Sequence, residues 1–212
     1  MLTLHIIILK KMDENQLIYS KPVIEFATVV AESCLFLERA EEHTKTDFIT
    51  TATRLLPLLY LKTSLLDLPE DESEGNIERF VTEDDYLFVK NQIERLLGAD
   101  DSFLEVFHPD MPYSDTPIAA FVSENLADIY QEIKDFAANF QIGESEIMTA
   151  ALAACLSAFA EHWGQKLLNA LRALHSVKYS ENFGEEETDD NLDPKEYRKL
   201  NRDSFLKFQS ED

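Results

Sequence analysis

The most regular pattern of apolar and polar positions lies between Gly143 and Tyr179, a stretch without proline. Residues 146–160 are apolar at almost every position, as in a helix that is buried all round. From Glu161 onward, the apolar side chains keep to one face at helical spacing: Trp163, Leu167, Ala170, Leu171, Leu174 and Val177. The pattern predicts one long helix over 144–178 that starts inside the core and emerges from it near Glu161. Its apolar run is too short and too interrupted to span a membrane.

Four further segments show helical periodicity, and we expect helices over 21–43, 46–66, 83–97 and 117–140. Pro57 should kink or break the second of them, because proline removes a backbone hydrogen bond and clashes with the preceding turn. The leucines of that segment are too many for one stripe, which predicts that it is heavily buried. They are Leu55, Leu56, Leu58, Leu59, Leu61, Leu65 and Leu66.

The fourth of these helices should be capped by Asp115 or Thr116, with Pro117 in its first turn. Its core stripe is accompanied by acidic residues on the outer side. Such a stripe is typically a solvated face, although it could also chelate a cation or meet a basic partner. The acidic residues are Glu124, Asp128, Glu132 and Asp135.

Together these segments predict an all-α fold, a single-domain helical bundle of about five main helices around the long central helix 144–178. The domain should cover residues 20–179, after an N-terminal arm over 1–19. The acidic tail 180–212 ends in a short amphipathic segment that could be a terminal helix or a mobile end. Within the arm, Met12 is the favoured start, which would make residues 1–11 an over-extended reading frame; a short strand or docking arm is the alternative.

The composition limits the kinds of binding partner and the cellular compartment that we expect. The net charge of −22 argues against nucleic acid and against an anionic membrane surface, which leaves a basic protein partner or simple solubility. Cys34 and Cys155 both lie in apolar helical pattern, so we expect free core thiols in a reducing, cytoplasmic compartment. The five glycines offer few places for a phosphate to approach the backbone closely.

No recognised catalytic motif occurs, and we predict no cofactor and no metal. A carboxylate-bridged metal site in a bundle needs Glu-x-x-His on two helices, and the sequence holds one copy, Glu105 to His108, in a linker. The linker 99–116 is rich in large apolar side chains and should pack back on the helices. If a site exists, we expect it where this linker meets the second half of the long helix. Its candidate residues are Glu161, His162, Asn169, Arg172, His108 and Tyr113.

These observations favour a non-catalytic protein-interaction or regulatory module over an enzyme. The alternative is a small-molecule- or metal-binding helical protein with a pocket near His162 and the 103–117 linker, which His162 and its neighbours would border.

Two stretches, FVSENLADIYQE at 121–132 and FAEHWGQKLLNAL at 159–171, resemble a bacterial domain-of-unknown-function family, the one numbered 5063. The resemblance covers about residues 20–179. It implies a small all-helical bacterial domain, and it brings no activity, cofactor or catalytic residue with it.

Overall fold

A computed structural model describes residues 17–67, 76–105, 118–181 and 183–184. Two units are distinguished, Met1–Tyr179 and Ser180–Asp212. The described helices and strands all lie in the first unit: α2 (Lys21–Glu38), the 3-10 turn η1 (Ala40–Glu42), α3 (Lys45–Ser64), α4 (Glu83–Leu97), the 3-10 turn η2 (Gly98–Asp101), β1 (Ser102–Leu104), β2 (Ala119–Phe121), α5 (Val122–Gln141), α6 (Ser145–Ala158), the π-helical turn η4 (Phe159–Trp163) and α7 (Gly164–Lys178). The N-terminal start, most of the tail and the 106–117 part of the linker lie outside the described residues.

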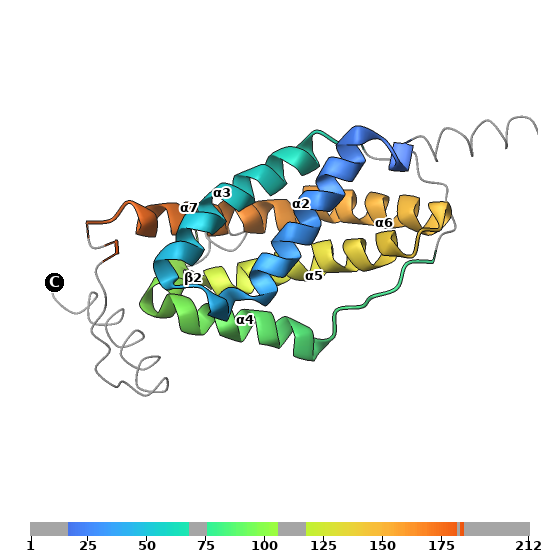
Figure 1. The fold of residues 1–212 in the computed structure, drawn as a ribbon. Helices are drawn as coiled ribbons and strands as arrows, with labels where there is room; N and C mark the ends of the chain where they lie inside the picture. Colours follow the sequence, from blue (N-terminus) through green and yellow to red (C-terminus); the bar gives the residue numbers. More distant parts are fainter. Residues whose placement is uncertain (1–16, 68–75, 106–117, 182, 185–212) are drawn as a thin grey trace, which may run out of the picture. The chain divides into compact units, whose positions relative to one another are not determined.

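The helices form a bundle, as predicted, in which α5 contacts α2, α4, α6 and α7 while α3 packs on α2 and α7. Figure 1 shows α5 running beside the rod made of α6, η4 and α7, with α2 crossing both and α3 crossing the α7 part of the rod. Between Val122 and Phe140 no side chain is fully exposed, so α5 shares the centre of the bundle with that rod. The all-α class is confirmed.

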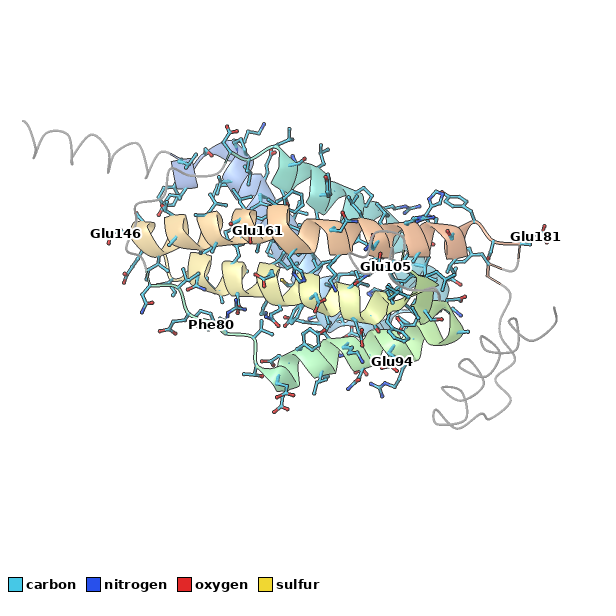
Figure 2. All side chains as sticks on the ribbon, turned by 180° about the vertical axis from the view of Figure 1, so that it is seen from behind. Phe80, Glu94, Glu105, Glu146, Glu161 and Glu181 are labelled. Atoms are coloured by element: carbon cyan, nitrogen blue, oxygen red, sulfur yellow. The ribbon has the colours of Figure 1, made fainter. Side chains whose placement is uncertain are left out.

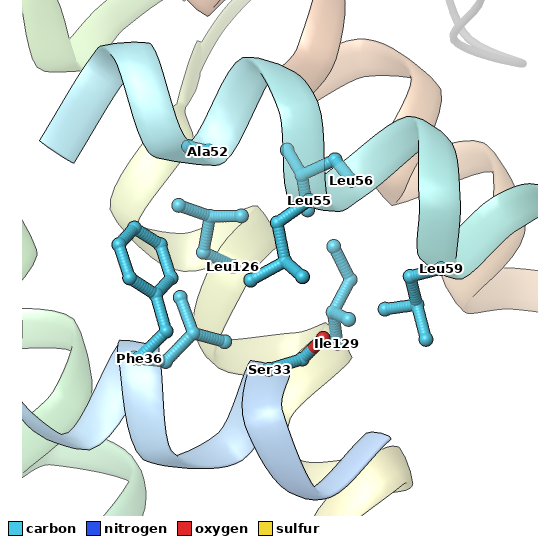
Figure 3. Close-up of a pocket in the computed structure, with 9 residues that line it drawn as sticks. Ser33, Phe36, Ala52, Leu55, Leu56, Leu59, Leu126 and Ile129 are labelled. Atoms are coloured by element: carbon cyan, nitrogen blue, oxygen red, sulfur yellow. The ribbon is translucent and has the colours of Figure 1, made fainter. Parts of the chain in front are cut away.

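The core contains a small void, which Figure 3 shows between α2, α3 and α5. Its volume is about 10 Å³, room for about one water molecule. The nearest hydroxyl, that of Ser33, already donates to the carbonyl oxygen of Val29 at 2.7 Å. Leu56, Leu59 and Leu126 form much of the lining, so the void is an apolar packing gap rather than a ligand site.

The α3 helix corrects two predictions. It runs from Lys45 to Ser64 with Pro57 inside it, so the helix does not break at Pro57. Tertiary packing of its buried stripe on its neighbours outweighs the lost hydrogen bond. The predicted heavy burial is also wrong, since Leu58, Leu61 and Leu65 are 40%, 51% and 63% exposed.

The starts and ends of α4 are set by local signals. The Thr82 hydroxyl and the Asp85 carboxylate each accept a backbone hydrogen bond of the other residue, which forms a capping box. Hydrogen bonds from Thr82 lower the pKa of the Asp85 carboxyl. The helix ends at Gly98, whose φ of 58° suits glycine, as predicted.

The start of α5 differs from the prediction. The helix begins at Val122, because Ala119–Phe121 pairs as β2 with β1 in a two-stranded antiparallel sheet. Asp101, just before β1, supplies the cap: its carboxylate accepts the backbone N–H and the hydroxyl of Ser123, both at 2.7 Å. A residue distant in sequence therefore takes the role expected of Asp115 or Thr116, which lie outside the described residues.

The long rod follows the predicted path, with one change of geometry. At η4 the helix widens into a π turn, and a π turn of this kind inserts an extra residue into the ladder. The indole Nε1 of the buried Trp163 donates to the carbonyl oxygen of Cys155 at 3.0 Å. The turn coincides with the predicted transition at Glu161, which Figure 2 shows midway along the rod.

Candidate functional site

The predicted site residues take different places. Asn169 donates to the Glu105 carboxylate at 2.9 Å and accepts from Gln165 at 3.1 Å, so it ties α7 to the end of β1. Glu161 and His162 are both exposed. His108 and Tyr113 lie outside the described residues.

The exposed Arg172 instead lines a hollow between α3 and α7. Within the described residues, neither Glu161 nor His162 lines this hollow, and Glu161 accepts from Ser157, one turn earlier in the rod, at 3.5 Å. Among the described residues, Arg172 therefore lines a hollow that it does not share with Glu161 or His162.

The acidic stripe of α5 is engaged within the protein. One Asp135 oxygen accepts the backbone N–H groups of Phe80 and Val81 at 2.7 and 2.9 Å. One turn later, the Asn139 side chain accepts the N–H of Glu78 and donates to its carbonyl oxygen. These bonds fix the extended segment before α4, on which Figure 2 labels Phe80, against α5.

Asp128, also in the acidic stripe, links three helices. It accepts the Tyr86 hydroxyl of α4 at 2.9 Å and pairs with Lys166 of α7 at 3.0 Å. Burial and the bond to Asp128 raise the pKa of the Tyr86 hydroxyl, which keeps it a donor. The other two acidic residues pair as Lys90–Glu124 at 3.4 Å and Arg79–Glu132 at 4.0 Å. The acidic residues of α5 therefore bind groups of the neighbouring elements and do not form the solvated face that we expected.

Two outward surfaces carry exposed large apolar side chains. On α4, Leu87 and Phe88 are 39% and 54% exposed, one turn after the exposed Glu83 and Asp84. On α3, Leu58, Leu61 and Leu65 are exposed, and a hollow lies between α3 and α7. The residues lining the hollow are Thr53, Pro57, Leu168, Leu171, Arg172, His175 and Ser176.

Neither surface was predicted from the sequence. On α3 the signal was readable: Leu58, Leu61 and Leu65 follow one another by three and four residues, on a different face from the buried Leu56 and Leu59.

The two thiols are buried, as predicted. Burial raises the pKa of Cys34 to about 12, and it raises the pKa of Cys155 as well. Both groups are therefore protonated at neutral pH and act as apolar core side chains. Among the described residues, no three His, Cys, Asp or Glu side chains form a group that could hold a metal ion.

A family model described as "Domain of unknown function (DUF5063)" matches residues 17–180, and the chain belongs to this family. A crystal structure of protein BF1032 from Bacteroides fragilis, a structural genomics target, is similar: 45% identity, 78% of this chain and 97% of that chain covered, and a TM-score of 0.70. No curated protein matches the chain. In the described part of the chain, no helix has the length and apolar content needed to cross a lipid bilayer.

Proposed function

We propose that this domain is a non-catalytic protein-interaction module that binds a basic amphipathic segment of a partner protein through the outer face of α4. The observation that carries the proposal is the α4 face itself, defined as Glu83, Asp84, Leu87 and Phe88. It places two large exposed apolar side chains beside two exposed carboxylates on adjacent turns of one helix.

The chemistry of this face suits a basic partner. Covering the half-exposed Phe88 ring with apolar groups would contribute part of the roughly 1.5–3 kcal/mol that full burial of such a side chain provides. Lysine or arginine side chains of the partner would lie near Asp84 and Glu83. The net charge of −22 would speed the encounter at low ionic strength.

The raised pKa values of the two buried thiols support a role without thiol chemistry. The alternative, a small-molecule or metal pocket near His162, has less support, because His162 and Arg172 do not share a hollow among the described residues. A ligand thermal-shift screen and elemental analysis remain the direct test of that alternative.

The test of the proposal uses two fluorescent amphipathic peptides with leucines at helical spacing and either lysines or glutamates on the polar face. We expect the lysine peptide to bind the full-length chain, in anisotropy titrations, with an affinity that falls as salt increases. Phe88→Gln and Asp84→Lys should each weaken that binding by about ten-fold. The matched control is Ile24→Gln on α2, another exposed apolar position (43%), which should bind normally.

Absence of lysine-peptide binding at low ionic strength would contradict the proposal. Equal affinities of the native chain and Phe88→Gln would also contradict it, because binding would then occur elsewhere. Circular dichroism of each variant confirms that the fold is retained.

A further inference from the structure

A second surface combines apolar and basic side chains, whereas the α4 face combines apolar and acidic ones. Between α3 and α7 lies an open hollow of about 510 Å³. Pro57, Leu168 and Leu171 give it an apolar lining, and Leu168 is 41% exposed. Arg172 and His175 bring nitrogen donors to the same hollow, and Thr53 and Ser176 bring hydroxyl groups.

The two helices that form this hollow are basic although the chain is acidic. Neither carries a glutamate, and α7 carries no acidic residue at all. Their charged residues are Lys45, Asp47, Arg54, Lys62, Lys166, Arg172 and Lys178. Three of the lysines are paired away from the hollow, as Lys45–Asp100, Lys62–Glu25 and Lys166–Asp128.

Three cations remain, Arg54, Arg172 and Lys178, and Arg172 lines the hollow. Lys178 donates to the hydroxyl of Thr53, a residue that lines the hollow, at 2.9 Å. Arg54, next to Thr53, and Arg172 are exposed, and neither forms an ion pair with another described residue. Arginine is the side chain best suited to bind a carboxylate through two parallel hydrogen bonds.

Exposed apolar side chains also run along α3. Arg54, Leu58, Leu61 and Leu65 follow one another by four, three and four residues, so they lie on one face of the helix. At 1.5 Å per residue this face is about 17 Å long, or about three turns. A small molecule would fill only the hollow, whereas a helix laid along α3 would cover the leucines as well.

We propose that this α3–α7 face, defined as Arg54, Leu58, Leu61, Leu65, Leu168 and Arg172, docks an acidic amphipathic helix of a partner protein. The apolar side of that helix covers Leu61 and Leu168, and its carboxylates bind Arg54 and Arg172. A second copy of this chain is a poorer occupant. A two-fold contact sets the same patch against itself, so that cations would face cations between two subunits of net charge −22.

The test uses the glutamate and lysine forms of the amphipathic peptide with the full-length chain. We expect the glutamate peptide to bind, and we expect backbone amide chemical shifts in α3 and α7 to change while those in α4 do not. Arg172→Glu together with Arg54→Glu should weaken binding by about ten-fold or more. Leu61→Gln should weaken it as well, without a change in net charge. Ile24→Gln serves as the matched control, because Ile24 is an exposed apolar residue on α2.

Several results would overturn the proposal. They are no binding of the glutamate peptide, undiminished binding to the Arg54→Glu/Arg172→Glu variant, and binding of both peptides at α4. A dimer in sedimentation that Leu61→Gln dissociates would assign the face to self-association instead, and recruitment to phosphatidylserine vesicles through Arg172 would assign it to a membrane surface. Binding of the lysine peptide at α4 is a separate readout, so that either proposal can fail while the other holds.

Discussion

Replacing Gly164 with alanine should destabilise the protein, even though alanine is the better helix former by about 1 kcal/mol. Gly164 follows the π turn, and that turn brings the carbonyl oxygen of Phe159 beneath its Cα. A Cβ atom added at Gly164 would lie 2.6 Å from that oxygen and 2.9 and 3.0 Å from two carbons of the Phe159 ring. Separations under 3 Å are not tolerated, so the π turn or the ring has to move.

Neither movement is easy. The Phe159 ring packs against Tyr60, at 5.1 Å between centroids, and against the fully buried Trp163, at 4.7 Å. Overpacking of a dense core costs about 1–3 kcal/mol. After the propensity gain of alanine is subtracted, we expect Gly164→Ala to lower the free energy of unfolding by up to about 2 kcal/mol.

Urea unfolding followed by circular dichroism measures this change. The matched control is Ala160→Gly in the same turn, where the side chain is exposed and packing plays little part. Ala160→Gly should lower the free energy of unfolding by about 1 kcal/mol, through the lower helix propensity of glycine alone. The reasoning about the π turn would be refuted if Gly164→Ala raised the free energy of unfolding, because the added methyl group would then fit without a clash.

Three further predictions concern buried polar groups. Asp101→Ala removes both hydrogen bonds to Ser123 and should lower the free energy of unfolding by about 1–3 kcal/mol in urea; native stability would show that the α5 cap lies elsewhere. The buried amide Nδ2 of Asn125 has no hydrogen-bond partner among the described residues, so Asn125→Leu should be neutral or stabilising; a loss above about 1 kcal/mol would show that the amide has a partner. Cys34, with a pKa of about 12, and the buried Cys155 should resist iodoacetamide at pH 8 and react in urea, as followed by mass spectrometry; rapid labelling of the native protein would contradict their burial.

The helices with local signals were predictable from the sequence. Thr82 with its acidic first turn and Gly98 bound α4 because capping depends on residues within one turn of the helix end. The long rod was predictable because its apolar pattern is continuous over more than thirty residues, and its fully buried side chains, such as Leu152 and Leu167, fall where the pattern put them.

Features that depend on distant partners were not predictable. The α5 helix starts late because β1 pairs with Ala119–Phe121 and because Asp101 caps Ser123 from the preceding linker. Neither contact leaves a signal near the helix start. The π turn left no separate signal either: the sequence marks Glu161 as a transition, and the turn's Phe159 packs against Tyr60 of α3, far away in the sequence.

The candidate surfaces show why net charge is a poor guide to a partner. The value of −22 predicted a basic partner, as if the acidic side chains were spread evenly. In the structure, Asp128 and Asp135 hold α5 to its neighbours and are unavailable to a partner, while Arg54 and Arg172 concentrate positive charge beside exposed leucines. Long-range attraction follows the total charge, but docking follows the groups within a few ångströms of the contact. An acidic protein can therefore present an acidic face for one partner and a basic face for another.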